Sequence, residues 1–310
     1  MTKPALSIAD QILLLEARGL RLAHGERDSL SRFLLDANYF RASGYWRLFL
    51  NDPMSPQSGF RSGISFSDIQ AIYNWDNELR HQLLRGLADY EVVFRARFAH
   101  YFSLRFEPES FTSPDVHREV FRDTHRGLLN LRSELLNSLR RDLKRASEPS
   151  VASALDEGKA PPIWIAIESL SMGTVSRMYE VANADIRYEL SRSLSLPNPD
   201  FAESLFRSLT IFRNHLAHHG RVWHHTPEFP PPVLRKLKTS SDNSIYERTP
   251  WAVIVGLSHQ INVISGSEAW SAQLFKHIDS IPKYLTGLTH PLNKFNRHVG
   301  PSETVAHHGD

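Results

Sequence analysis

The stretch FAESLFRSLTIFRNHLAHHGRVWHH, residues 201–225, joins an apolar helical pattern to a dense group of Arg, Asn and His side chains. Four apolar residues recur at steps of four, three and four: Leu205, Leu209, Phe212 and Leu216. This spacing places them on one helix face, which packs into a core. Asp200, with Glu203 three residues later, predicts a capping-box-like start, and Gly220 predicts the C-terminal end. We therefore expect a central helix with one buried face.

The opposite face of this predicted helix is polar. Arg207, Asn214, His218 and Arg221 are spaced seven, four and three residues apart. At about 100° per residue, they form one stripe along the helix. This stripe is the candidate functional site, and the rest of the chain is expected to support it.

The composition indicates a globular protein and excludes several chemistries. The chain has 310 residues, of which 41% are hydrophobic, so it can bury a substantial core. It has neither a long apolar run nor a signal peptide, so we expect a cytoplasmic protein without a membrane partner. The absence of cysteine excludes disulfides, thiol catalysis and Cys-based zinc sites. The net charge of +2 is small, so any nucleic-acid affinity must come from local clusters of basic residues.

The longest helical pattern begins at a capping box made by Ser65 and Asp68, and its apolar residues then recur every three or four positions as far as Tyr101. This pattern predicts a central bundle helix. Its other face carries several arginines, which either track phosphates or are simply solvated. The candidate RNA-binding residues are Arg80 and Arg95 on this helix, and Arg41 and Arg207 outside it.

The remaining segments also predict helices. Residues 118–145 are expected to form one helix with a basic face, residues 147–159 a loop, and Thr249 with Pro250 the start of a later helix. No alternating strand pattern is evident, so the predicted class is all-α, a multi-helix bundle. We expect four parts: an N-terminal helical segment, a helical core, a C-terminal helical segment and a frayed tail, at residues 1–64, 65–225, 226–290 and 291–310.

Arg213, Asn214 and His218 supply the groups that metal-free RNA cleavage needs. An imidazole titrates near neutral pH and can take the 2′-hydroxyl proton or give one to the leaving 5′-oxygen. A guanidinium can hold the phosphate and its transition-state charge. Arg213 and His218 are five residues apart, so on an ideal helix they point about 140° away from each other. They can act together if the helix loosens near Gly220 or if two copies of the chain meet.

Three other interpretations stay open on the residues alone. Cations near a helix C-terminus are favoured by the macrodipole, so Arg213, His218 and Arg221 can be there for stability. A zinc site is a second interpretation, although no HExxH pattern is present, and its ligands would be His215, His218, His219 and His224. A DNA-binding helix-turn-helix is the third.

Three blocks of the chain resemble the Abi family of bacterial abortive infection proteins, of the AbiD and AbiF type, within the HEPN superfamily of helical RNases. The blocks are YFRASGYW at residues 39–46, PPIWIAIESLSMGTVSRMY at 161–179 and LTIFRNHLAHHGRVW at 209–223, in the family's order and rough spacing. The resemblance covers most of the chain. It implies a HEPN-type bundle with additional N- and C-terminal helices.

The resemblance also implies roles for single residues. The HEPN pattern is an Arg, usually followed by a polar residue, with a His four to six residues beyond, which makes Arg213, Asn214 and His218 the catalytic candidates. His219 and Arg221 match the family pattern as second-rank site residues. Family members usually continue with Trp-Asn-Arg where this chain has Trp-His-His at residues 223–225, so no role is carried over to the two histidines.

The partners follow from the same resemblance. It implies a homodimer with a composite cleft and association with a small structured RNA. An exposed Trp223 and residues 229–232 are expected to add apolar area to the dimer contact. We expect no cofactor.

The main hypothesis is a metal-independent endoribonuclease in phage defence that leaves a 2′,3′-cyclic phosphate and a 5′-hydroxyl. The alternatives are a non-catalytic RNA- or DNA-binding module and a toxin held inactive by an RNA or protein partner.

Overall fold

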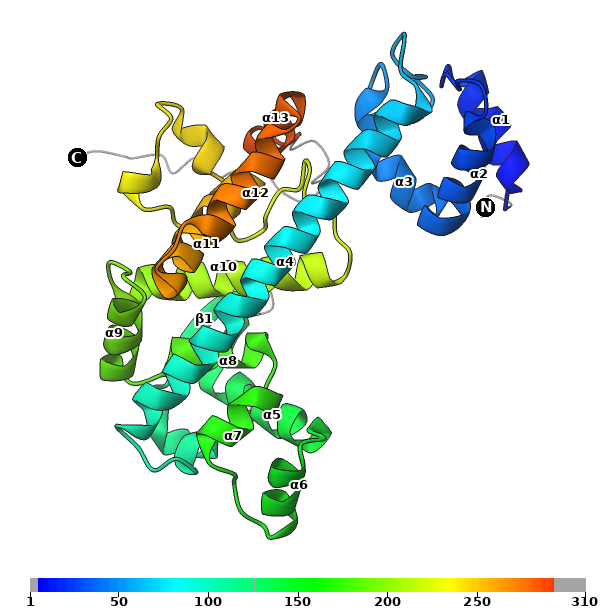
Figure 1. The fold of residues 1–310 in the computed structure, drawn as a ribbon. Helices are drawn as coiled ribbons and strands as arrows, with labels where there is room; N and C mark the ends of the chain where they lie inside the picture. The colour runs from blue at the N-terminus through cyan, green and yellow to red at the C-terminus, as the bar shows by residue number, and fades with distance from the viewer. Residues whose placement is uncertain (1–4, 125–126, 293–310) are drawn as a thin grey trace, which may run out of the picture. The chain divides into compact units, whose positions relative to one another are not determined.

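The computed structural model describes residues 5–124 and 127–292 and confirms the all-α class, because helices dominate the fold and one short hairpin is its only β-sheet there (Figure 1). The chain divides into two compact units. The first unit covers Met1–Glu78 and Leu292–Asp310, and the second covers Leu79–Pro291. The predicted tail at 291–310 falls almost entirely outside the described residues, and the other predicted domain ranges stay predictions.

The first unit is built from short helices around an apolar core. Its elements are α1 (Ile8–Ala17), α2 (Glu26–Ala37), α3 (Tyr39–Trp46), a 3₁₀ turn (Arg47–Phe49) and the beginning of α4 (Phe66–Ser103). The block at residues 39–46 forms α3, in which the buried Tyr45 hydroxyl donates to the Asp76 carboxylate on α4 at 2.7 Å. Trp46 packs in the core with Leu15, Leu34 and Phe66. Tyr45 and Trp46 thus have a packing role, whereas Phe40 of the same block is 86% exposed.

The long helix α4 starts at the predicted capping box. The Ser65 hydroxyl and the Asp68 carboxylate accept from each other's backbone N–H groups at 3.4 and 3.1 Å. These bonds satisfy donors that a helix N-terminus otherwise leaves without partners. The apolar pattern that follows is confirmed, since Leu83, Leu87 and Phe98 are fully buried.

The second unit contains the rest of α4 and all later elements. The first group is 3₁₀ turns Ser110–Thr112 and Pro114–Val116, β1 (Phe121–Thr124), β2 (Gly127–Asn130), α5 (Leu131–Arg145), α6 (Pro149–Asp156) and α7 (Ile163–Ser169). The second is α8 (Met172–Val181), α9 (Ala184–Ser193), α10 (Pro199–Ala217), 3₁₀ turns Arg235–Leu237 and Asn243–Tyr246, α11 (Pro250–Ser265), α12 (Ala269–Asp279), 3₁₀ turn Pro282–Tyr284 and α13 (Leu285–Thr289).

Two local predictions were wrong. Residues 118–145 do not form one helix, because β1 and β2 pair antiparallel, from Phe121 with Asn130 to Thr124 with Gly127. The Asn130 side chain then caps α5 by accepting from the Ser133 N–H at 3.1 Å. The predicted loop at 147–159 contains α6, which begins at Pro149, a residue pre-set for the first helical position. The predicted start of α11 at Thr249 and Pro250 is confirmed.

Candidate functional site

The central helix α10 begins two residues earlier than the sequence predicts. Asn198, not Asp200, is the N-cap, and its side-chain oxygen accepts from the Phe201 N–H at 2.8 Å. Pro199 is the first helical residue, where its missing N–H costs no hydrogen bond. Asp200 and Glu203 instead accept from the Arg187 guanidinium at 3.0 and 2.7 Å. These two acids therefore tie α10 to α9.

A cluster of buried aromatic rings holds α10 against α4 and α8. The ring of Phe206 lies 4.4 Å from that of Phe94 on α4 and 4.7 Å from that of Tyr179 on α8, between centroids. Tyr90 also contacts Phe206 at 6.3 Å. Rings at these separations gain specific packing energy in addition to their buried area. The cluster fixes which face of α4 meets α10.

Glu91 lies on this face of α4 and connects two arginines. One carboxylate oxygen pairs with Arg95 on the same helix, and the other lies 3.3 Å from Nε of Arg213 on α10. The Glu91 residue is only 8% exposed. Arg95 also donates to the carbonyl oxygens of Ile167 and Glu168 at the end of α7, at 2.5 and 3.1 Å. We call Glu91, Arg95 and Arg213 the buried carboxylate network.

The network anchors Arg213 without enclosing it. The Arg213 side chain remains 39% exposed, whereas those of Glu91 and Arg95 are about 10% exposed. An Arg213 Nη atom also lies 3.4 Å from the side-chain oxygen of Asn214, an exposed residue. The structure therefore brings the first two catalytic candidates together at the surface, and the anchored guanidinium keeps donors for an anion.

His218 lies at the C-cap of α10, immediately after the last helical residue, Ala217. Its residue is exposed, and its imidazole makes no hydrogen bond or ion pair with another described residue. Its backbone N–H donates to the Asn214 carbonyl at 3.0 Å. This arrangement fixes the backbone of His218 relative to Asn214 and leaves the imidazole at the surface.

The turn that ends α10 differs from the prediction at Gly220. His219, with φ of 60°, takes the left-handed position that usually favours glycine. The Gly220 N–H donates to the His215 carbonyl at 2.8 Å, as in a Schellman motif. Gly220 is needed for another reason, because a Cβ atom there would lie 2.3 Å from the His215 ring.

Gly220→Ala is accordingly expected to destabilise the protein by about 1–3 kcal/mol, the usual cost of forcing extra atoms into a packed site. Thermal unfolding followed by circular dichroism measures the effect. Gly173→Ala is the matched control, since Gly173 lies inside α8 and an added Cβ would meet only ordinary contacts at 3.8 Å. An unchanged melting temperature for Gly220→Ala would contradict the close approach of the His215 ring.

Three further histidines near the end of α10, His215, His224 and His225, are half-buried. The rings of His215 and His225 stack with centroids 3.9 Å apart, and His215 Nε2 lies 2.9 Å from the Arg221 carbonyl oxygen. Burial, together with His215 and Arg221, lowers the pKa of His225 to about 3. Burial and Arg221 lower the pKa of His224 to about 4. Neither side chain suits acid–base chemistry at neutral pH.

These low pKa values predict acid sensitivity. In the unfolded chain a histidine titrates near 6.5, so it binds protons more readily there than His225 does in the folded state. The stabilisation is complete above pH 6.5 and is lost as the pH falls towards the folded values. We expect the melting temperature to fall between pH 7.5 and pH 5. The fall should be smaller in His225→Phe, and an identical pH profile would contradict the burial of this imidazole.

The candidate RNA-binding arginines lie in different environments. Arg80 and Arg95 are buried, at 5% and 8% exposure, and Arg95 is paired with Glu91 in the buried carboxylate network. Arg207 lies over the Phe229 ring at 3.8 Å, and burial lowers its pKa. Arg41 belongs to the first unit, where its Nε donates to the Tyr73 hydroxyl at 3.2 Å. The three arginines of the second unit, Arg80, Arg95 and Arg207, therefore do not form one exposed surface.

Trp223 does not supply the expected apolar area for a dimer. It is 6% exposed, and its indole N–H donates to the Tyr284 carbonyl at 3.1 Å. A Cβ atom at Gly287 would lie 2.0 Å from the same indole nitrogen, so α13 packs directly against the ring. Trp223 therefore connects the segment that follows α10 to α13 and the 3₁₀ turn before it, within the same chain.

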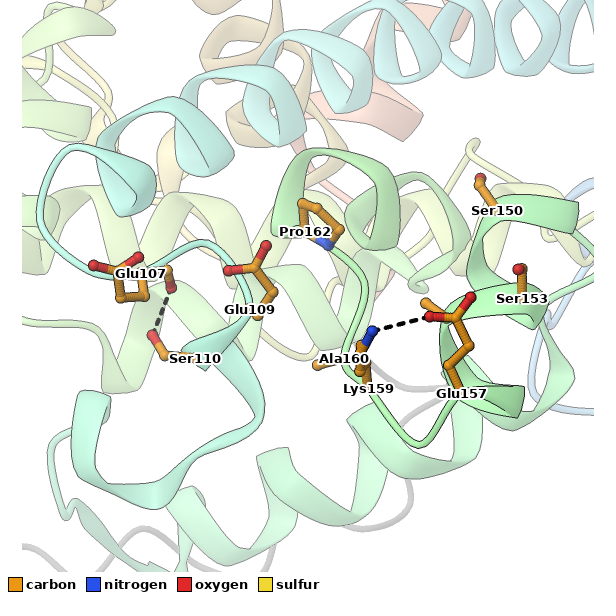
Figure 2. A pocket seen from close by; sticks show the side chains of 10 residues that line it. Glu107, Glu109, Ser110, Ser150, Ser153, Glu157, Lys159, Ala160 and Pro162 are labelled. Carbon is orange, nitrogen blue, oxygen red and sulfur yellow. Dashed lines mark hydrogen bonds and ion pairs between the residues drawn. The ribbon is translucent and has the colours of Figure 1, made fainter.

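A separate cleft of about 900 Å³ opens near α6 (Figure 2). Its lining includes Glu107, Glu109 and Glu157, with Lys159 paired to Glu157 at 3.1 Å. None of the catalytic candidates lines it. Three carboxylates against one ammonium give it a negative charge, which repels a phosphate backbone. This cleft therefore does not suit RNA.

The part of the chain that the structure describes contains neither a metal-binding cluster nor a helix able to span a membrane. No group of three or more His, Asp or Glu side chains there converges as a metal site requires. None of the helices in this part combines the length and the apolar composition needed to cross a bilayer.

Glu91 is the site residue that sequence reasoning missed. Its position four residues before Arg95 is a signal for an ion pair on one helix face. The sequence does not reveal that the carboxylate also reaches Arg213, which is 122 positions further along the chain. That contact depends on the aromatic cluster that packs α4 against α10.

Fold and site together define a helical protein with an exposed Arg–Asn pair and a terminal His on a helix anchored from within. The chain belongs to the Abi-like protein family, whose model matches residues 32–224. This family suggests a part in abortive infection, a form of phage defence. Comparisons with curated proteins and with solved structures found no match. The residues after 224, including α11 to α13, lie outside the matched region.

Proposed function

We propose that this chain is a metal-independent endoribonuclease of the HEPN superfamily, of the AbiD and AbiF type, that acts in phage defence. The observation that carries the proposal is the anchoring of a partly exposed Arg213 by the buried Glu91, beside the exposed Asn214. A guanidinium held in this way is pre-oriented for a phosphate. The family match supports the biological context.

The proposed reaction is an internal transesterification of RNA. The 2′-oxygen attacks the adjacent phosphorus, the bond from phosphorus to the 5′-oxygen breaks, and a 2′,3′-cyclic phosphate and a 5′-hydroxyl form. His218 takes part in the two proton transfers, from the 2′-hydroxyl and to the 5′-oxygen. Arg213 stabilises the charge that develops on the phosphate oxygens, and Asn214 offers an amide for orientation.

The site further favours a homodimer. Arg213 lies on the regular helix and His218 at its C-cap, so the two side chains leave the backbone in different directions. A two-fold axis near the end of α10 would let the Arg of one chain and the His of another face one groove. Sedimentation at micromolar concentration tests this arrangement. A monomer that retains full cleavage activity would contradict it.

The test of the enzyme is an RNA cleavage assay in EDTA with purified protein. We expect discrete products that carry a 2′,3′-cyclic phosphate and a 5′-hydroxyl. Intact RNA that remains bound to the protein would instead support the non-catalytic binding module. Cleavage that appears only after a bound RNA or protein is removed would show that a partner holds the enzyme inactive.

A further inference from the structure

A second cleft, of about 490 Å³, lies among the 3₁₀ turn Arg235–Leu237, α11 and α12. Its volume falls in the range of roughly 300–1,000 Å³ that small-molecule sites occupy. It contains none of the catalytic candidates, and it lies beyond the family-matched residues 32–224. Any ligand here would therefore be a property of the C-terminal part of this chain.

Two aromatic rings form one wall of this cleft. The rings of Trp251 on α11 and Phe275 on α12 lie 5.8 Å apart between centroids and are inclined by 57°. Valine side chains complete the apolar lining. A flat heteroaromatic group such as a nucleobase gains stacking energy against such rings, and this holds for every kind of base.

Three buried polar atoms of the lining have no hydrogen-bond partner among the described residues, and one of them is Nε1 of Trp251. The other two are Oγ of Ser258, a residue only 4% exposed, and Nε2 of the neighbouring His259. Buried polar atoms are nearly always bonded, so each such atom needs an explanation. Burial and the nearby Lys236 lower the pKa of His259, which keeps its imidazole neutral at pH 7. A neutral imidazole and a hydroxyl can both match the edge of a base.

The charges around the cleft suit the rest of a nucleotide. Lys236 is exposed in the 3₁₀ turn and supplies an ammonium group. Glu268, the residue before α12, supplies a carboxylate that can accept from sugar hydroxyls. A ligand that uses every feature needs a flat polar ring, hydroxyl groups and an anionic group.

We infer that this cleft binds a nucleoside monophosphate, with its base against Trp251 and Phe275 and towards Ser258 and His259, and its phosphate towards Lys236. The same chemistry is found in a free nucleotide and in the 5′-phosphorylated end of an RNA strand. The inference does not rest on the proposed nuclease activity.

The experiment is calorimetric titration of the full-length chain with AMP, GMP, CMP and UMP, and with the corresponding nucleosides. A 5′-phosphorylated, 2′-O-methylated RNA oligonucleotide forms a separate arm. Because it lacks a free 2′-hydroxyl, it cannot be cut, so this test can fail or succeed independently of the cleavage assay. Binding of free nucleotides alone identifies a small-molecule site, and binding of the oligonucleotide alone identifies a site for an RNA end.

Two variants connect binding to the cleft. Lys236→Gln should weaken binding of the monophosphate about tenfold and leave nucleoside binding unchanged, as expected for the loss of one charged contact. Ser258→Ala should weaken both ligands by roughly five- to tenfold without lowering the melting temperature, because its hydroxyl bonds to nothing in the free protein. Arg235→Gln is the matched control, since Arg235 is an exposed neighbouring cation that does not line the cleft.

Three results would overturn the inference. The first is the absence of saturable binding of every nucleotide and of the oligonucleotide at millimolar concentration. The second is an equal loss of affinity in Arg235→Gln and Lys236→Gln, which would show unspecific charge attraction. The third is unchanged affinity in both Lys236→Gln and Ser258→Ala.

Discussion

His218→Ala is expected to reduce RNA cleavage by roughly 10²- to 10⁴-fold, the usual contribution of a positioned acid–base group. The fold should be unaffected, because the imidazole is exposed and makes no hydrogen bond or ion pair with another described residue. Cleavage in EDTA measures the activity, and the melting temperature checks the fold. The backbone bond from His218 to Asn214 remains in the alanine variant.

The matched control for His218 is the neighbouring His219. Its φ of 60° makes asparagine a better replacement than alanine, because asparagine tolerates the left-handed region. His219→Asn should reduce cleavage much less than His218→Ala. Equal activity of His218→Ala and the wild type would show that the catalytic assignment is wrong. A His218→Ala variant that unfolds would indicate that the histidine acts through stability.

The sequence predicted those parts of the fold that local chemistry determines. The capping box at Ser65 and Asp68 and the cap at Thr249 involve residues only a few positions apart, so their patterns can be read directly. The apolar face of α10 was also predictable, since Leu205, Leu209 and Leu216 are buried as the spacing requires. Hydrophobic periodicity thus identified the helix and its buried face.

The wrong predictions of local structure have physical causes, because the residues at these positions carry competing or weak local signals. At the start of α10, Asn198 and Asp200 are both good caps, and the proline between them favours Asn198 by taking the first helical position. Gly220 carries the signal of a helix end, but its real constraint is the His215 ring. The β1–β2 hairpin is too short to give a period of two that stands out from helical neighbours.

The candidate site was predictable only in part. Arg213, Asn214 and His218 follow one another within six residues, so a local pattern found them. The carboxylate that anchors Arg213 comes from α4, and the carbonyl groups that hold Arg95 come from α7. Two of the three blocks that resemble the family, at 161–179 and 209–223, contact each other directly through α8 and α10 and are also linked through α4, which belongs to neither block.

Glu91→Ala is expected to cost about 3–5 kcal/mol of stability, because it leaves a buried guanidinium without its counter-charge. Most of this cost comes from the charge of Arg95, which water solvates poorly because its side chain is only 10% exposed. For a unit of this size, the melting temperature should fall by roughly 10 °C. Asp89→Ala is the matched control, because it removes an exposed carboxylate from the same helix and should change stability by at most about 0.5 kcal/mol.

A double variant separates stability from the positioning of Arg213. Replacing a buried ion pair by apolar residues of similar size is often neutral, so Glu91→Leu with Arg95→Met should recover part of the lost stability. Recovery stays incomplete, since the carbonyls of Ile167 and Glu168 lose their donor. Cleavage should nevertheless remain low, because Arg213 no longer has its carboxylate anchor. If the double variant regained both stability and full cleavage, Glu91 would be a packing residue, and the anchoring of Arg213 would have no part in catalysis.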